Sequence, residues 1–182
     1  LAGALVEGGV RHWSVIYMRD TFSAPDWVDT LTLPAFLLAQ TAGRMFADRV
    51  IARFGPVAVA RAGQIACFGG VLLVVFAPTL TVSLAGFLLI GLGTCVGFPL
   101  VTSAAAQLGD RPSSENVASL TLAAQVILLG APAAMGYFAE VYGLRVTYAL
   151  LLPVIVLAFY LARYLAPRPV VATRSAAAGR GP

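Results

Sequence analysis

The chain has 182 residues, of which 59% are hydrophobic and only 11% are charged, and its mean hydropathy is +0.87. Roughly a quarter of the residues in a soluble domain are charged, so this composition excludes a soluble globular protein. The formal net charge of +4 comes from arginines spread along the chain. Nucleic-acid binding is also excluded, because a binding groove needs clustered basic residues interleaved with aromatic ones.

Six long apolar stretches, separated by short turns, predict an all-α polytopic membrane bundle of six transmembrane helices. About 20 residues, each rising about 1.5 Å, cross the hydrocarbon core of a bilayer. We expect helices at residues 2–18, 31–51, 57–77, 80–108, 117–139 and 146–165. Because the turns are short, consecutive helices should lie antiparallel in one bundle over residues 1–166.

The first expected helix carries charged and aromatic residues. Glu7 and Arg11 lie four residues apart on one helical face, and each would cost about 2.5 to 3.5 kcal/mol if it faced lipid. They form either a self-neutralising structural pair or a site for substrate binding or proton coupling. His12 lies beside them and is a further candidate. Trp13 and Tyr17, one turn apart, are either a packing stripe or a stacking platform for a sugar or aromatic ligand.

A polar stripe runs along the second expected helix. Gln40, Arg44 and Asp48 recur every four residues, and the stripe leads into Arg49 and Arg53. An acid one turn from an arginine allows that arginine to stay charged at membrane depth, and the Asp48 carboxylate can accept hydrogen bonds from a neighbouring helix N-terminus. We therefore expect a latch between two helices at the end of this helix that carries Asp48.

The fourth and fifth expected helices contain interior glycines and prolines. Gly93 and Gly97 have the spacing that lets two helix backbones approach closely, and Pro99 then interrupts the backbone hydrogen bonds. Gly130 and Pro132 repeat this pattern in the fifth helix. These residues serve either packing alone or the flexing of helices during a conformational change.

The two triplets of helices show weak internal symmetry. The second helix of each triplet contains a proline, Pro34 or Pro132, and ends in an aromatic residue followed by glycine, Phe54-Gly55 or Tyr142-Gly143. An inverted repeat of three plus three helices is a recurrent plan of transporters. The symmetry predicts such a repeat here.

The distribution of arginines predicts the orientation. One side of the bundle should carry Arg49, Arg53, Arg61, Arg111 and the arginines of the tail, whereas the other side has only Arg19 and Arg145. By the positive-inside rule, the arginine-rich side and the C-terminus are cytoplasmic. Residues 167–182 are rich in Pro, Ala, Gly and Arg, so they predict a disordered cytoplasmic tail.

The sequence offers no metal site or catalytic cluster. Cys67 and Cys95 lie within apolar stretches without further ligands at short spacing, so we interpret both as reduced packing residues and expect no metal or cofactor. A membrane enzyme should cluster His, Asp or Glu near one interface. His12 is the one histidine in the chain, so we expect no catalytic residues and no enzymatic activity.

Several segments resemble the major facilitator superfamily of membrane carriers. Residues 43–49, Gly-Arg-Met-Phe-Ala-Asp-Arg, followed by Arg53-Phe54-Gly55, resemble its cytoplasmic loop motif. Glu7-Gly8, Trp13-Ser14 and Tyr17-Met18-Arg19-Asp20 resemble the seventh helix of its fucose-permease-like and sugar-permease-like branch. Gly91-Leu92-Gly93 with Phe98-Pro99-Leu100, and residues 136–140 with Gly143, are similar to its tenth and eleventh helices.

This resemblance implies the C-terminal six-helix half of a twelve-helix carrier over residues 1–166, and the start at Leu1, within an apolar stretch, suggests a fragment. It implies that Asp48 and Arg49 act as a cytoplasmic latch. The implied gating motif comprises Gly43, Arg44, Asp48, Arg49, Arg53 and Gly55. The implied partners are an N-terminal six-helix half, the lipid bilayer, a small-molecule substrate and a proton.

The favoured function is secondary transport of a small solute by alternating access across a bacterial inner membrane. No nucleotide-binding loop is recognisable, so an ion or proton gradient should supply the energy. Two alternatives stay open: a six-span membrane scaffold or receptor, and a half-size protein that acts only as a dimer.

Overall fold

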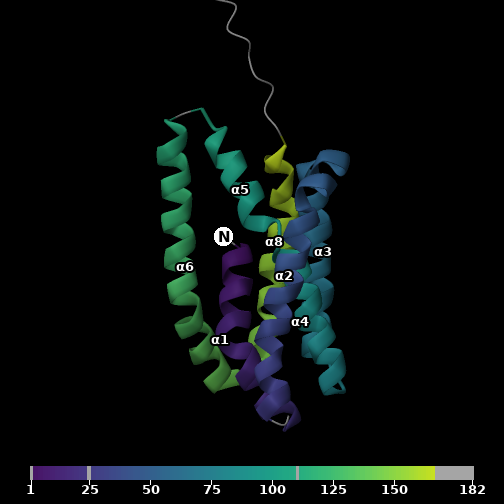
Figure 1. Ribbon diagram of the computed structural model, residues 1–182. Coiled ribbons are helices and arrows are strands. Elements are labelled where there is room, and N and C mark those ends of the chain that lie inside the picture. Colours follow the sequence, from purple (N-terminus) through teal and green to yellow (C-terminus); the bar gives the residue numbers. More distant parts are fainter. Residues whose placement is uncertain (1, 24–25, 110, 167–182) are drawn as a thin grey trace, which may run out of the picture.

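The computed structural model describes residues 2–23, 26–109 and 111–166, and helices make up nearly all of them (Figure 1). The elements are α1 (Ala2–Phe22), α2 (Asp26–Phe54), α3 (Pro56–Val75), α4 (Leu80–Thr94), α5 (Gly97–Ala106), α6 (Ser113–Tyr142), α7 (Leu144–Ala149), α8 (Leu151–Leu161) and the 3-10 helix η1 (Ala162–Leu165). No strand occurs within these ranges, so the all-α prediction is confirmed. The predicted tail, residues 167–182, lies outside the described residues.

The elements correspond to the six predicted spans, with two of them interrupted. The fourth span divides into α4 and α5 at Cys95 and Val96, and the sixth divides into α7, α8 and η1. Pro99 and Pro153 follow these breaks, and a proline withholds the N–H that the carbonyl four residues earlier would accept. The first link is shorter than predicted, because α1 extends to Phe22 and α2 begins at Asp26.

Four spans among the described residues are long and apolar enough to cross a membrane: Pro56–Val75, Leu80–Ala106, Ser113–Tyr142 and Leu144–Leu165. The helices α1 and α2 do not meet that criterion, and they hold most of the charged residues of the described helices.

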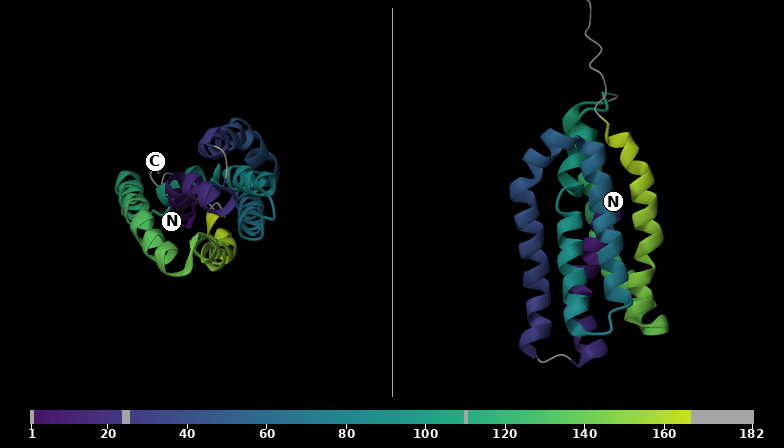
Figure 2. Two further views of the ribbon diagram at one scale, coloured as in Figure 1. Left: turned by 90° about the horizontal axis from the view of Figure 1, so that it is seen from below. Right: turned by 90° about the vertical axis from the view of Figure 1, so that its right-hand side faces the viewer.

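The helices run side by side along one axis (Figures 1 and 2). The arginine-rich end of the bundle holds the α2–α3 turn, the α5–α6 link and the end of η1. The arginine-poor end holds the α1–α2, α3–α4 and α6–α7 links. Helix α1 lies between α6 and α2 in Figure 1 and contacts α2, α4, α5, α6, α7 and α8. It is the central helix of the fold.

The core near the arginine-poor end is built on aromatic rings. Tyr17, Phe87 and Tyr148 are fully buried and pack edge to face, with ring centroids 5.2 to 6.0 Å apart. The two tyrosine hydroxyl groups donate to backbone carbonyls, that of Tyr17 to Val74 and that of Tyr148 to Gly9. This cluster joins α1, α3, α4 and α7.

Glycines bring α3 and α4 into backbone contact. A Cβ atom on Gly70 would lie 2.7 Å from the carbonyl oxygen of Gly86, and one on Gly93 would lie 2.6 Å from that of Gly63. Gly97 shares the four-residue spacing with Gly93, but a Cβ there would meet nothing within 4 Å. The expected close approach through both glycines is thus corrected: the packing requires Gly93 and leaves Gly97 unconstrained.

The two aromatic-glycine turns have the same backbone conformation. Gly55 has φ 81° and ψ 158°, and Gly143 has φ 81° and ψ 159°. A positive φ favours glycine, and an added Cβ would meet no other atom at either site. The match agrees with the expected equivalence of the two triplets at the ends of α2 and α6.

The glycine contacts predict a difference between two neighbouring substitutions. Gly70→Ala should overpack the α3–α4 contact and cost about 1 to 3 kcal/mol, seen as a lower melting temperature of the solubilised protein. Gly69→Ala is the control, because its Cβ would lie 3.6 Å from Leu89 and alanine favours the helix by up to about 1 kcal/mol. Equal melting temperatures for the two variants would contradict the packing described here.

Candidate functional site

The charged pair of α1 has the predicted geometry. Arg11 donates to Glu7 Oε1 through Nε at 2.9 Å and through Nη2 at 2.6 Å. The Glu7 side chain is 22% exposed and that of Arg11 is 39% exposed. The pair therefore lies at an open face of the central helix rather than inside the bundle. Its part in binding or coupling stays a prediction.

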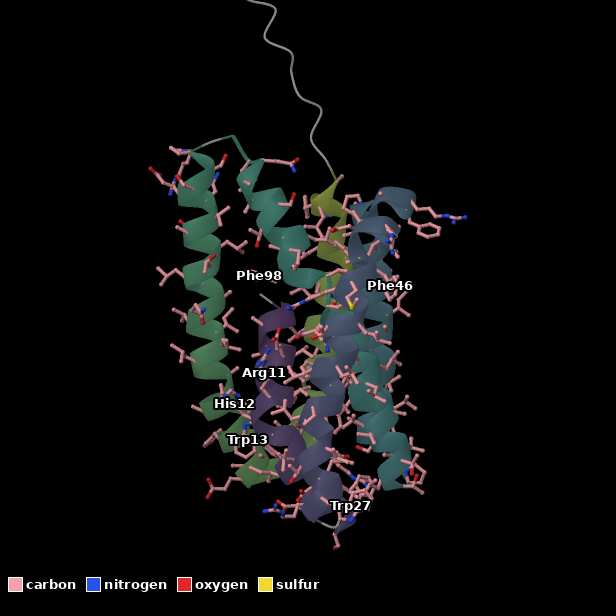
Figure 3. All side chains as sticks on the ribbon, in the orientation of Figure 1. Arg11, His12, Trp13, Trp27, Phe46 and Phe98 are labelled. Carbon is pink, nitrogen blue, oxygen red and sulfur yellow. The ribbon has the colours of Figure 1, made fainter. Side chains whose placement is uncertain are left out.

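The next residues of α1 are hydrogen-bonded to backbone carbonyls. Nδ1 of His12 lies 2.9 Å from the carbonyl oxygen of Gly8, and it must carry the proton because a carbonyl only accepts. Nε1 of Trp13 donates to the carbonyl of Pro132 at 3.2 Å, and the indole ring lies against Gly136. Figure 3 shows Arg11, His12 and Trp13 along α1, between α6 and α2. Trp13 thus attaches α1 to α6.

The structure corrects the pairing of Trp13 with Tyr17 as a stacking platform. Tyr17 is fully buried and in edge contact with Phe22, Phe87 and Tyr148. Its ring presents no open face to a ligand. The alternative interpretation, a packing stripe, describes Tyr17, whereas the half-buried Trp13 connects two helices.

The polar stripe of α2 contacts the break between α4 and α5. Nε2 of Gln40 donates to Oγ1 of Thr94 at 3.2 Å, and Nε of Arg44 donates to the carbonyl of Cys95 at 3.2 Å. Two members of the stripe thus join α2 to the α4 side of the break, whereas the part of Asp48 in a latch stays a prediction. Asp48 is exposed.

The rest of the predicted gating motif lies at the arginine-rich end of α2. Arg49 and Arg53 are exposed, and the guanidinium of Arg53 stands 5.4 Å from the ring centroid of Phe54. Gly43 lies further inside, where a Cβ would come 2.7 Å from Sγ of Cys95. Gly55 forms the turn into α3. The motif therefore combines an exposed end with a part packed against the helix break.

The candidates for helix flexing have different surroundings. Pro99 is the third residue of α5, next to the break. Pro132 lies inside α6, and its carbonyl accepts a hydrogen bond from the indole of Trp13. A Cβ on Gly97 or Gly130 would meet nothing within 4 Å. Close packing therefore explains Gly93 but neither Gly97 nor Gly130, and flexing stays a prediction for those two.

A cavity of about 510 Å³ lies near the arginine-rich half of the bundle, among α1, α3, α4, α5, α6, α8 and η1. Its wall is apolar apart from a few side chains such as Gln64 and Thr94, and Gly93 and Gly97 line it. The charged pair and the aromatic residues of α1 lie outside this wall. Sequence reasoning missed the cavity, because its wall comes from seven separate elements.

Both arginines of the arginine-poor end connect elements, which the sequence did not indicate. Nε of Arg19 donates to Oδ2 of the buried Asp29 at 2.8 Å, joining α1 to α2. Arg145 donates to the carbonyl of Ala77 at 3.2 Å, with its guanidinium 5.9 Å from the ring centroid of Phe22. The short turn that separates Arg19 from Asp29 was a signal for this ion pair, but Asp29 was expected to lie in a loop.

The amino-acid sequence matches one known protein family and is similar to several known proteins. The family model of the Major Facilitator Superfamily matches residues 13–181. The uncharacterized transporter y4wD of Sinorhizobium fredii is 32% identical over 148 residues, which is 81% of this chain and 39% of that relative. An uncharacterized MFS-type transporter of Yersinia pestis is 27% identical over 79% of this chain and 38% of its own length.

The membrane protein MosC of Rhizobium meliloti is 30% identical over 77% of this chain and 34% of its own length. The chain thus spans less than half the length of these three relatives. No solved structure matches the chain significantly.

Proposed function

Since the chain belongs to the Major Facilitator Superfamily and is an integral membrane protein, we propose that it forms the C-terminal six-helix half of a secondary transporter. The transporter moves a small solute across the membrane by alternating access and is coupled to protons. The three relatives, each more than twice as long as the matched segment, leave room for a further bundle of similar size.

One observation carries this proposal: the Glu7–Arg11 pair lies on the open face of the central helix. Helix α1 is surrounded by other helices, yet both side chains of the pair are partly exposed. Charged side chains at membrane depth cost several kcal/mol against lipid and are found against protein or a water-filled cavity. A second bundle placed over this face would enclose the pair in an aqueous site between two halves.

The chemistry of this face suits a polar solute and a proton. Glu7 can accept a proton and Arg11 can donate hydrogen bonds, while Nε2 of the neutral His12, about 100° further around α1 than Arg11, can accept one. The resemblance of α1 to sugar permeases favours a sugar as the solute.

We also propose that the arginine-rich end faces the cytoplasm of a bacterial cell, with the C-terminus on that side. At this end lie Arg49 and Arg53 of α2, Arg111 of the α5–α6 link and Arg163 of η1, and short arginine-bearing loops stay in the cytoplasm. In this orientation Asp48 and Arg49 are exposed toward the cytoplasm, available to latch onto an N-terminal half.

The coupling role of Glu7 predicts a defined pattern of variants in the protein expressed from its complete gene. Glu7→Gln imitates the protonated carboxyl, so it should abolish accumulation of a sugar driven by a proton gradient and leave exchange of that sugar intact. Uptake and exchange in proteoliposomes measure the two activities. The control is Glu140→Gln, an exposed acid at the arginine-poor end.

A purely structural pair gives a different result. Glu7→Gln would then lower the folded yield by leaving Arg11 unpaired, and adding Arg11→Gln would restore both yield and uptake. That rescue would contradict the coupling role of Glu7.

The orientation predicts the signals of reporter fusions. Fusions made after Pro112 and after Arg174 should both report a cytoplasmic location, whereas a fusion after Pro78 should report the outside. An external signal at either of the first two positions would reverse the proposed topology.

The latch predicts a conformational effect of Asp48→Asn. This change removes a charge from an exposed residue, so the folded yield should stay within about 20% of wild type, because substitutions at the surface are usually worth less than about 0.5 kcal/mol. Uptake should fall severalfold, and Asp20→Asn, an exposed acid at the other end, serves as the control. Wild-type uptake in Asp48→Asn would leave the motif with a role in topology alone.

A further inference from the structure

The break between α4 and α5 leaves the carbonyl of Cys95 without its helical donor. In a continuous helix the carbonyl of Cys95 would accept the N–H of residue 99. Residue 99 is a proline and has no N–H. The backbone at Cys95 (φ −57°, ψ −35°) and Val96 (φ −99°, ψ −10°) stays close to helical, and Cys95 is only 6% exposed. A buried carbonyl of this kind needs a donor from elsewhere.

Arg44 supplies that donor. Its Nε donates to the Cys95 carbonyl at 3.2 Å, from α2. One turn before it on α2, Gln40 donates to Thr94, which itself donates to the carbonyls of Ile90 and Gly91. The preceding residue, Gly43, has no side chain, and a Cβ there would come 2.7 Å from Sγ of Cys95. The glycine brings α2 close to the break, and the arginine hydrogen-bonds to it.

The first three residues beyond the break, Gly97, Phe98 and Pro99, are loosely surrounded. A Cβ on Gly97 would meet nothing within 4 Å, and both Phe98 and Pro99 are exposed. Gly97, Phe98 and Val101 line the 510 Å³ cavity, so one side of α5 faces unfilled space. Leu100, the residue after Pro99, is 7% exposed and belongs to the same buried cluster as Val59 and Ala162, so α5 is held by this packing together with the contacts at the break.

We propose that Arg44 is a positioning residue whose guanidinium replaces the N–H that Pro99 lacks and thereby holds α5 at its angle to α4. Release of this contact lets α5 move about the break. The contact between Arg44 and the Cys95 carbonyl concerns the resting structure alone. The use of the α5 movement during solute transport rests on the proposed function.

Hydrogen exchange measured by mass spectrometry tests the contact without any solute, in the protein expressed from its complete gene. Arg44→Met removes the donor and keeps an unbranched side chain. Amides of residues 97–106 should then exchange at least threefold faster than in wild type, while amides of residues 64–75 in α3 stay unchanged. Thr41→Met is the control, because Thr41 lies on the same helix, is exposed and stands outside the gating motif, so its exchange pattern should equal that of wild type.

Pro99→Ala gives the decisive comparison, because alanine restores the N–H within the chain. In the Pro99→Ala background, Arg44→Met should change the exchange of residues 97–106 by less than twofold. If Arg44→Met does not fold on its own, recovery of the folded protein by adding Pro99→Ala supports the proposal, and failure of that recovery overturns it. An equal effect of Arg44→Met in both backgrounds, or no effect in either, also overturns it.

The outcome is separate from that of the transporter proposal. Exchange of residues 97–106 is read without flux, so a chain that carries no solute can still show the dependence on Arg44. Conversely, if amide hydrogen exchange becomes faster in Arg44→Met but sugar uptake persists, the role of the contact in positioning α5 is supported and its use in transport is rejected.

Discussion

A backbone carbonyl buried in a membrane protein needs a hydrogen-bond donor, because lipid supplies none. This constraint explains why α1 and α2 carry so many polar residues. Arg44 bonds to the carbonyl freed by Pro99, and Tyr17 bonds to Val74 in the last turn of α3, where carbonyls lack helical donors. Arg145 bonds to Ala77 just beyond that turn. Polar side chains here complete the backbone of neighbouring helices.

The sequence predicted the architecture because both of its signals are local. Apolar length identifies each span, and the turns between Phe54 and Pro56 and between Tyr142 and Leu144 follow from glycine. The division of the fourth and sixth spans was less accessible. Pro99 indicated a disturbed helix, but whether a proline bends a helix or ends it depends on its neighbours, here Arg44 and the cavity.

The roles of individual site residues depended on contacts between distant segments. Trp13 and Tyr17 look equivalent in sequence, one turn apart, yet one bonds to Pro132 and the other is enclosed by Phe87 and Tyr148. Gly93 and Gly97 differ in the same way, since only the first faces another backbone. Periodicity places residues on a face of a helix, but it does not say what that face contacts.

The hydrogen-bond pattern separates polar residues with structural partners from those whose charges face an open surface. Gln40, Arg44 and Tyr17 each satisfy a group on another helix. The Glu7–Arg11 pair bonds only within α1 in the contacts described above, and its partly exposed charges stabilise no neighbouring helix. A charged pair facing lipid carries a cost of a few kcal/mol, so this open face needs protein or water against it in the membrane. The proposed second bundle would provide that cover.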